Sequence, residues 1–255
     1  MRLSPATPCR ILILGGTSEA MELAAHLSGN REFGVISSLA GRTAQPRLPA
    51  GEVRIGSFGG VQGLIDFLSA NAIDLVVDAS HPFAARISSN AAKACQLSNV
   101  TLLVLERPQW SPVAGDRWYE VQDVGSAASL SAELGRRLFL TVGRQDLAQF
   151  AAFPRVWFLI RSIEMPDPPL PLQHEILLRR GPFDPREEMT LLQEHRIDVL
   201  VSKNSGGSAT YSKIVAAREL GIPVVLVKRP LQPVACCVSS TSDVLAWISN
   251  FKSTR

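Results

Sequence analysis

The sequence predicts an α/β protein built on doubly wound parallel sheets. Short aliphatic runs alternate with amphipathic helical segments along most of the chain. Several runs, such as Ile11–Leu14, are apolar at every position, which is typical of strands buried on both faces of a parallel sheet. Glycine-rich or polar residues follow these runs, at the edge where open parallel sheets bind ligands. With 255 residues, the chain is long enough for two such units.

The first strand, turn and helix organise the rest of the chain. The strand Ile11–Leu14 ends abruptly at Gly15 and Gly16, and Thr17 or Ser18 can cap the helix that follows. The apolar residues of this helix recur at i, i+3, i+4 and i+7, namely Ala20, Leu23, Ala24 and Leu27. Such a turn directs free N–H groups and the positive end of a helix at one point, which suits a phosphate.

The turn is an imperfect form of the G-x-G-x-x-G dinucleotide fingerprint. In that register it carries Gly15, Thr17 and Ala20, so only the first glycine is kept, and Gly16 is an additional one. The alternative is a tight turn in an ordinary α/β protein. We favour nucleotide binding, because many parallel sheets bind ligands at this turn.

The end of the second predicted strand, Phe33–Ser38, favours NADPH over NADH. An NAD site has an acidic residue near this point for the ribose 2′-hydroxyl, but this chain has Ser37, Ser38 and then Arg42. Hydroxyls and a guanidinium suit a 2′-phosphate. The alternative is that Arg42 is a solvated loop residue.

The remaining elements divide between two halves. In the first, strands are expected at Glu52–Ile55, Asp74–Asp78 and Leu102–Leu105, with helices from Val61 and up to about Leu97. Residues 107–112 contain two prolines, break the alternation and are typical of a linker. The sequence therefore predicts domains at 1–106 and 107–255, the first binding the dinucleotide and the second contributing to a substrate cleft.

The second half repeats the strand and helix pattern without a close sequence repeat. Strands are expected at Leu138–Val142, Val156–Ile160, Ile176–Leu178, Asp198–Ser202 and Ile222–Val227, and helices around Pro185–His195 and Ser242–Phe251. Lys203–Thr210 forms a second glycine turn that opens a helix, so we expect it to be the counterpart of the turn at Gly15–Thr17.

Charged residues follow the predicted strands in both halves. A cleft between the two strand edges would bring together Arg42, Arg144, Arg161 and Lys203, which would suit a ligand with several negative charges. Lys203 could bind phosphate or a substrate carboxylate, or lie in solvent. His81, three residues after Asp78, could act as an acid or a base, or bond a loop carbonyl in a structural role.

Composition excludes several other classes. A net charge of +3 without a basic cluster argues against nucleic acid as a partner. The four cysteines form no C-x-x-C pair and are expected to be free thiols, and the scattered histidines have no metal-ligand spacing. No signal segment or apolar run of membrane length occurs, so we expect a cytoplasmic protein without a membrane partner. The sequence does not determine the oligomeric state, and a monomer is one possibility.

Six segments, in order, resemble the precorrin-6A reductase family of corrin (vitamin B12, cobalamin) biosynthesis. Each is short, but together they span nearly the whole chain; they are Ile13–Ala20, Ser38–Arg42, Asp78–Ala84, Glu106–Trp110, Val142–Arg144 and Lys203–Gly207. The resemblance implies two Rossmann-like domains around a cleft. It also implies an oxidoreductase that uses NADPH to reduce one double bond of the tetrapyrrole precorrin-6A, giving precorrin-6B, with hydride added at C19 and a proton at C18.

The resemblance and the residue patterns together assign site residues. Gly15, Gly16, Thr17 and Ser18 would hold the cofactor pyrophosphate, and Ser38 and Arg42 its 2′-phosphate. The residues expected to bind substrate are Arg144, Arg161 and the loop residues Asn204, Ser205, Gly206 and Gly207. The catalytic candidates are Lys203, Asp78 and His81. Two alternatives stay open, a cobalt-precorrin-6A reductase of the anaerobic branch and a non-catalytic NADPH-binding redox sensor.

Overall fold

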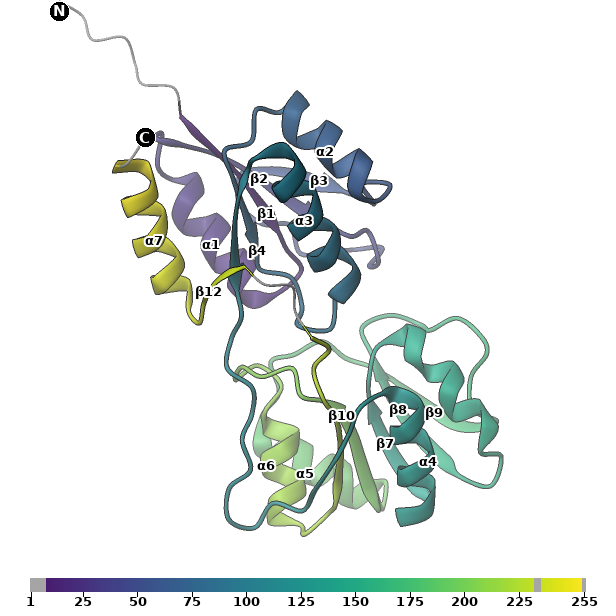
Figure 1. Ribbon diagram of the computed structural model, residues 1–255. Coiled ribbons are helices and arrows are strands. Elements are labelled where there is room, and N and C mark those ends of the chain that lie inside the picture. The colour runs from purple at the N-terminus through teal and green to yellow at the C-terminus, as the bar shows by residue number, and fades with distance from the viewer. Residues whose placement is uncertain (1–7, 232–234, 254–255) are drawn as a thin grey trace, which may run out of the picture. The chain divides into compact units, whose positions relative to one another are not determined.

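The computed structural model describes residues 8–231 and 235–253, which fall into two compact units (Figure 1). The first comprises Met1–Arg107 and Leu231–Arg255, and the second comprises Pro108–Pro230. Each unit contains a six-stranded sheet in which every strand pair is parallel. The α/β class predicted from the alternation of strands and helices is therefore confirmed.

The first sheet has β1 at its centre and the order β12-β5-β4-β1-β2-β3. Its strands are β1 (Cys9–Leu14), β2 (Phe33–Leu39), β3 (Glu52–Ile55), β4 (Leu75–Asp78), β5 (Thr101–Leu105) and β12 (Cys236–Val238). The helices of this unit are α1 (Ser18–Ser28), α2 (Val61–Ala70), α3 (Ala85–Ser98) and α7 (Thr241–Ser253).

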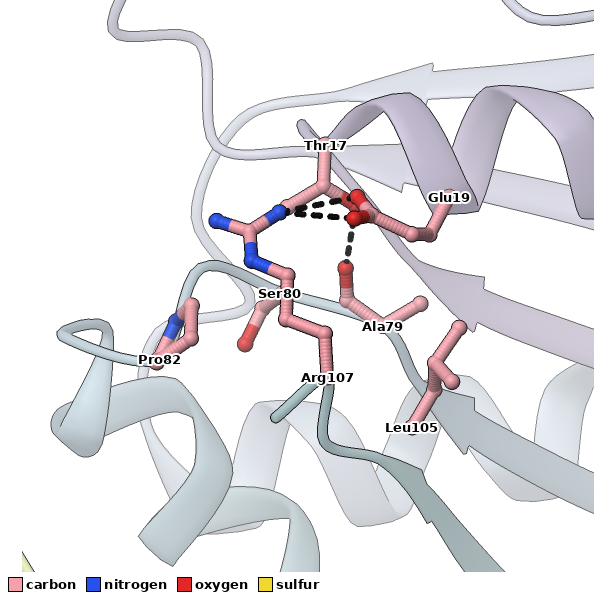
Figure 2. Close-up of a pocket in the computed structure, with 7 residues that line it drawn as sticks. All are labelled: Thr17, Glu19, Ala79, Ser80, Pro82, Leu105 and Arg107. Carbon is pink, nitrogen blue, oxygen red and sulfur yellow. Dashed lines mark hydrogen bonds and ion pairs between the residues drawn. The ribbon is translucent and has the colours of Figure 1, made fainter. Parts of the chain in front are cut away.

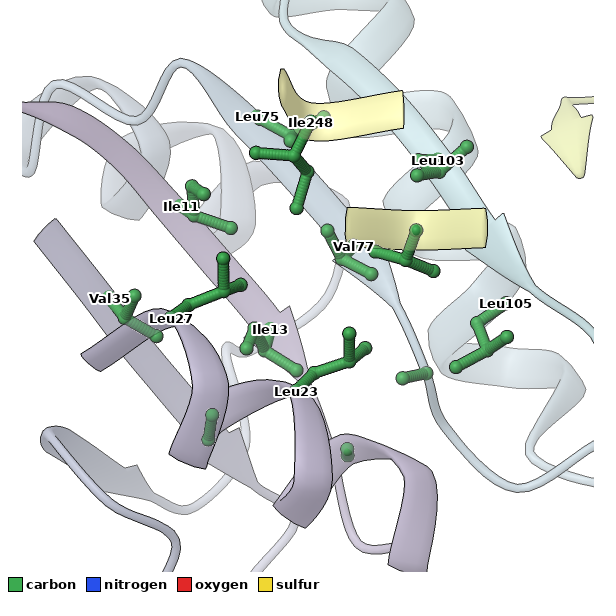
Figure 3. Close-up of a cluster of buried hydrophobic side chains, with 14 of the residues drawn as sticks. Ile11, Ile13, Leu23, Leu27, Val35, Leu75, Val77, Leu103, Leu105 and Ile248 are labelled. Atoms are coloured by element: carbon green, nitrogen blue, oxygen red, sulfur yellow. The ribbon is translucent and has the colours of Figure 1, made fainter. Parts of the chain in front are cut away.

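Two hydrophobic clusters cover the two faces of this sheet. Ile11 and Ile13 of β1 pack with α1 and α7, whereas Leu12 and Leu14 pack with α2 and α3. Side chains alternate between the faces of a strand, so a strand buried on both faces must be apolar at every position. Figure 3 shows the first cluster, in which Ile248 of α7 lies among side chains of β1, β4 and α1.

The C-terminal segment corrects the predicted domain boundaries. The prediction placed all of 107–255 in one domain, but β12 pairs with β5, and Val244 and Ile248 of α7 are buried in the core of the first unit. Without β12, β5 would present an unpaired edge. The composition shift near Glu106 marks the point where the chain leaves the first unit. A second short segment with two prolines, Pro230 and Pro233, occurs in the sequence where the chain returns, but the prediction placed no boundary there.

The second sheet has the order β6-β11-β10-β7-β8-β9. Its strands are β6 (Trp118–Val121), β7 (Arg137–Thr141), β8 (Trp157–Ser162), β9 (Gln173–Leu178), β10 (Val199–Lys203) and β11 (Val224–Val227). Its helices are α4 (Val124–Leu134), the 3-10 helix η1 (Arg144–Ala152), α5 (Pro185–Glu194) and α6 (Ser212–Glu219).

Both sheets follow the strand order 3-2-1-4-5-6 of dinucleotide-binding folds. The first reads β3-β2-β1-β4-β5-β12 and the second reads β9-β8-β7-β10-β11-β6. The sixth position is filled by the last strand of the chain in one unit and by a strand that precedes β7 in the other. In both units, the order reverses beside the first strand, so each sheet has one switch point, between β1 and β4 or between β7 and β10.

This topology corrects one expectation about the turns. The counterpart of the turn after β1 is the turn after β7, at Gly143, rather than the turn after β10 at Lys203–Thr210. The turn after β10 corresponds instead to the turn after β4, which follows Asp78. It also does not open a helix directly, because α6 begins only at Ser212.

Candidate functional site

The switch point of the first unit has an open glycine turn. The N–H of Gly15 donates to the carbonyl of Ser38 at 3.0 Å, and the N–H of Ala79 donates to the carbonyl of Leu14 at 3.0 Å, which ties the turn to β2 and β4. Gly16 has φ +108°, and a Cβ there would meet nothing within 4 Å. The left-handed conformation favours glycine, and the space in front of it is free for a ligand.

The turn leads directly into α1. Thr17 is the N-cap: its hydroxyl oxygen accepts from the N–H of Ala20 at 3.1 Å, and its O–H donates to the carbonyl of Ala79 at 2.7 Å. Ser18, the first helical residue, is exposed. The remaining N–H groups of the first turn and the helix dipole can hold a phosphate here.

Arg107 lies beside this helix terminus, in a role that the sequence analysis missed. Its Nη1 is 2.9 Å from both carboxylate oxygens of Glu19, in the first turn of α1, and both side chains are largely buried. Figure 2 shows the pair lining one pocket with Thr17 and Ser80. The guanidinium offsets the negative charge of Glu19 close to the anion site. The sequence did carry a signal, because Arg107 follows β5 by two residues, at the edge where ligands bind. The sequence analysis instead placed Arg107 in the linker.

A second arginine, also missed, lies at the end of β2. Arg54 of β3 donates from Nη1 to the hydroxyl of Ser38 at 3.3 Å and also donates to the carbonyls of residues 56–57. Its guanidinium stacks on the ring of Phe58 at 3.8 Å. Arg42 is exposed in the segment that follows β2. Two arginines, Arg42 and Arg54, therefore lie at or just after the end of β2, where a 2′-phosphate is expected.

Asp78 and His81 both stabilise the turn after β4. Asp78, 3% exposed, accepts from the N–H of Ser80 at 3.0 Å, and Nδ1 of the exposed His81 accepts from the N–H of Phe83 at 3.2 Å. Both line a pocket in the first unit. Burial, with a smaller contribution from Asp78, raises the pKa of Cys95 to about 12, so this thiol stays protonated. Proton transfer by Asp78 or His81 stays a prediction.

The switch point of the second unit contains an ion pair. Lys203, the last residue of β10, places Nζ 2.6 Å from Oδ2 of Asp146 in η1. The same oxygen accepts from the N–H of Gly143 at 3.1 Å. Asp146 was not predicted, because its spacing from Lys203 in the sequence is 57 residues and no local pattern joins them.

The two other predicted cationic residues of this unit differ in exposure. Arg144 is partly exposed and lies 3.6 Å from Glu164. Arg161 is only 8% exposed; its Nη1 is 2.5 Å from Oε1 of Glu188, and its guanidinium stacks on the ring of Phe183 at 3.8 Å. The predicted contact between Arg161 and substrate is therefore disfavoured, because its guanidinium is buried in an ion pair that supports α5.

The loop after Lys203 is braced from within the second unit. The side chain of Asn204, 2% exposed, accepts from the N–H of Trp110 at 2.9 Å and donates to its carbonyl at 3.1 Å. The side chain of Asn204 therefore braces the loop, which disfavours its predicted contact with substrate. Ser205 is also buried, whereas Gly206 and Gly207 have φ +66° and +74°. Gly207 accepts from the indole N–H of Trp110 at 2.8 Å.

The described residues contain neither a candidate metal centre nor a candidate membrane span. Among the residues that the structure describes, no group of three or more His, Cys, Asp or Glu side chains could hold a metal ion. In the same part of the chain, no helix is long and apolar enough to span a membrane.

Residues 10–249 match the family model of the precorrin-6x reductase CbiJ/CobK. The chain is 50% identical to a precorrin-6A reductase of Rhodococcus erythropolis, over 94% of this chain and 97% of the relative. It is 29% identical to a cobalt-precorrin-6A reductase of Salmonella typhimurium, over 86% and 87%.

A solved structure shows the same arrangement of elements. It is described as CobK precorrin-6A reductase, matches this chain with a TM-score of 0.90 at 40% identity, and the match covers 95% of this chain and 96% of the other. The strand orders, the two switch points and the match along nearly the whole sequence lead to one conclusion: the chain belongs to the precorrin-6x reductase CbiJ/CobK family.

Proposed function

We propose that this protein reduces precorrin-6A to precorrin-6B with NADPH as the reductant. The observation that carries the proposal is the 50% identity, over 94% of the chain, to a relative named precorrin-6A reductase. The cobalt-precorrin-6A reductase of Salmonella typhimurium is much more distant, at 29% identity, which favours the cobalt-free substrate.

The first unit has the features required to hold the cofactor. Gly16 leaves open space at a left-handed turn, and Thr17 and Ser18 begin a helix of 11 residues whose N-terminus can bind a pyrophosphate. In this assignment, Gly15 ties the turn to β2, and Arg107 offsets the charge of Glu19 next to the anion. NADPH, when bound, supplies the hydride that is added to C19, while a proton is added to the neighbouring C18.

Selection of NADPH over NADH rests on the end of β2. Ser38, Arg42 and Arg54 would bind the 2′-phosphate, since no carboxylate follows β2 as far as Arg42. Because Arg54 already donates to two carbonyls and stacks on Phe58, its guanidinium is fixed before any ligand binds. Fixed donors bind with a smaller loss of side-chain entropy.

The second unit would handle the charges of the substrate. Arg144 and the N–H groups at Gly206 and Gly207 would bind carboxylate arms of the tetrapyrrole. Lys203, with its compact ammonium group, would stabilise the negative charge that arrives with the hydride. The proton for C18 would come from Asp78, His81 or solvent.

An anaerobic assay of NADPH oxidation tests this function. Precorrin-6A, with NADPH, should give a product that has gained two hydrogen atoms by mass spectrometry, at a rate well above that with NADH. Turnover of cobalt-precorrin-6A alone would instead assign the protein to the anaerobic branch. Tight NADPH binding without turnover of either tetrapyrrole would favour the redox sensor.

Lys203→Met tests the role of the ammonium group, because methionine keeps much of the stem without the charge. If Lys203 stabilises developing charge, kcat should fall about 100-fold with little change in cofactor affinity. A rise in KM for the tetrapyrrole at constant kcat would assign Lys203 to carboxylate binding only. An unchanged kcat/KM would remove Lys203 from the site.

A further inference from the structure

The second unit fills its switch point with a charged side chain of its own. β7 and β10 are neighbours, and their paired residues run up to Ser202 beside Thr141, so Lys203 and the turn at Gly143 lie at the same sheet edge. In dinucleotide-binding folds, this position, after the first strand, holds a phosphate. Here the carboxylate of Asp146 accepts from the N–H of Gly143 at 3.1 Å, as a bound anion would.

Asp146 is itself held firmly. Its N–H donates to the carbonyl of Gly143 at 2.9 Å, so backbone and side chain of one residue bond the same glycine. The oxygen that bonds Gly143 also lies 2.6 Å from Nζ of Lys203. The side chains of Asp146 and Lys203 are 24% and 18% exposed, so solvent reaches neither freely.

Glycine at position 143 makes room for this arrangement. A Cβ there would lie 2.9 Å from Oδ2 of Asp146 and 3.8 Å from Nζ of Lys203. The backbone of Gly143, with φ −71° and ψ 153°, is allowed for any residue, so the requirement is space rather than conformation. An alanine would displace the carboxylate from the ion pair with little strain on the backbone.

We propose that Asp146 is a positioning residue for Lys203, an inference that rests on the proposed function. A lysine side chain has a flexible stem of four carbons, and it loses much conformational entropy when its ammonium is fixed. The anchored carboxylate fixes Nζ before substrate binds, so the ammonium meets the developing charge without reorganising. Asp146 therefore acts on the reaction only through Lys203.

A double-mutant cycle tests this dependence. Asp146→Asn keeps an acceptor for the N–H of Gly143 and removes the charge. We expect it to lower kcat about tenfold with little change in NADPH affinity, because misplacement of a catalytic group affects the chemical step. In the Lys203→Met background, Asp146→Asn should have no further effect, since two residues that act as one unit are not additive.

Two further variants sharpen the test. Asp146→Glu keeps the carboxylate and should restore part of kcat, and Gly143→Ala should lower kcat with both charges retained. Asp123→Asn is the matched control, because Asp123 caps α4 in the same unit, accepting from the N–H of Ser126 at 2.8 Å, and should leave kcat unchanged. Thermal unfolding of each variant identifies any loss of folded protein.

The outcomes separate the inference from the proposed function. A slow Lys203→Met enzyme with a fully active Asp146→Asn enzyme would overturn the inference alone. Additive losses in the double variant would also overturn it, because they would mean that Asp146 affects kcat independently of Lys203. Full activity of Lys203→Met would overturn this inference and the role proposed for Lys203. A wild-type protein that reduces no tetrapyrrole would overturn the proposed function as well as the inference.

Discussion

The two switch points share a topology but differ in what occupies them. In the first unit, β1 leads through Gly16 into an α-helix, and Thr17 joins the two turns by a neutral hydrogen bond to Ala79. In the second, β7 leads into a 3-10 helix, and an ion pair between Asp146 and Lys203 joins the two sides.

This difference indicates how one fold can serve two purposes. A helix N-terminus beside open space can accept an external anion at the N–H groups of its first turn. When an internal carboxylate takes that place, the anion site is lost, but a neighbouring lysine gains a fixed partner. The comparison therefore supports the proposal of a cofactor site in the first unit and a positioned cation in the second, and four predictions test the contrast.

The largest expected change in the free energy of unfolding comes from a substitution in the loop that follows Lys203. Gly206 has φ +66°, and a Cβ there would lie 2.1 Å from the carbonyl oxygen of Pro108 and 2.4 Å from Nη2 of Arg229. Gly206→Ala should lower the free energy of unfolding by about 4 kcal/mol or more, since strain and overlap with backbone add. Gly16→Ala, in open space, should cost about 1–3 kcal/mol from strain alone. Urea unfolding of both variants measures this contrast, and equal losses would contradict it.

The exposure of the first turns of α1 and α6 provides the second test. α1 begins at polar, accessible residues, whereas Lys213, the second residue of α6, is only 4% exposed, and its Nζ lies 5.3 Å from the centre of the Trp110 ring. Burial lowers the pKa of Lys213 to about 7, with a smaller contribution from Arg161 that Glu188 opposes.

The sign of the resulting pH dependence follows from proton binding. Between pH 7 and the ordinary lysine pKa of about 10.4, the unfolded chain binds a proton that the folded chain lacks, so stability should rise with pH across this window. Lys213→Met removes the cost of burying this amine, so it should stabilise the protein by roughly a few kcal/mol at pH 6.5. The gain should shrink towards pH 10, where the unfolded lysine also loses its proton. Denaturant midpoints at both pH values provide the measurement. A gain that is the same at both would mean that Lys213 keeps its proton when folded.

The third test concerns the anion specificity of the first switch point. Arg42→Glu and Arg54→Ala should each weaken NADPH binding by about 1.5–3 kcal/mol, the range for hydrogen bonds to charged groups, and leave NADH binding nearly unchanged. Fluorescence titration of each protein with both cofactors gives the Kd values. Arg47→Ala, an exposed arginine in the same connection, is the matched control. Equal affinity of the wild-type protein for the two cofactors would contradict the assignment.

The smallest effect is expected at the cap of α1. Thr17→Val removes the acceptor for Ala20 and the donor to Ala79 with little change in volume, and it should cost about 1–2 kcal/mol of stability. Thr17→Ser should retain most of the stability, because serine keeps both bonds. Thermal unfolding compares the two variants, and similar losses would mean that the methyl group, rather than the hydroxyl, stabilises the turn.

The sequence alone was sufficient for much of the fold and for the conformation of the first turn. Fully apolar runs such as Ile11–Leu14 identified strands buried on both faces, because residue burial leaves a direct trace in local sequence. The glycines and hydroxyls of residues 15–18 identified the first turn for the same reason, since turn conformation and helix capping depend on adjacent residues. The ordered motifs, together with these patterns, also indicated the family.

Only the tertiary structure decided which distant segments meet. It placed β12 and α7 in the first unit, paired Lys203 with Asp146, buried Arg161 against Glu188, and assigned Asn204 to the backbone of Trp110. Each of these depends on strand order or on partners far apart in the chain. A charged residue after a strand has the same local sequence whether it faces a ligand or an internal counter-ion, so the folded partner alone distinguishes the two.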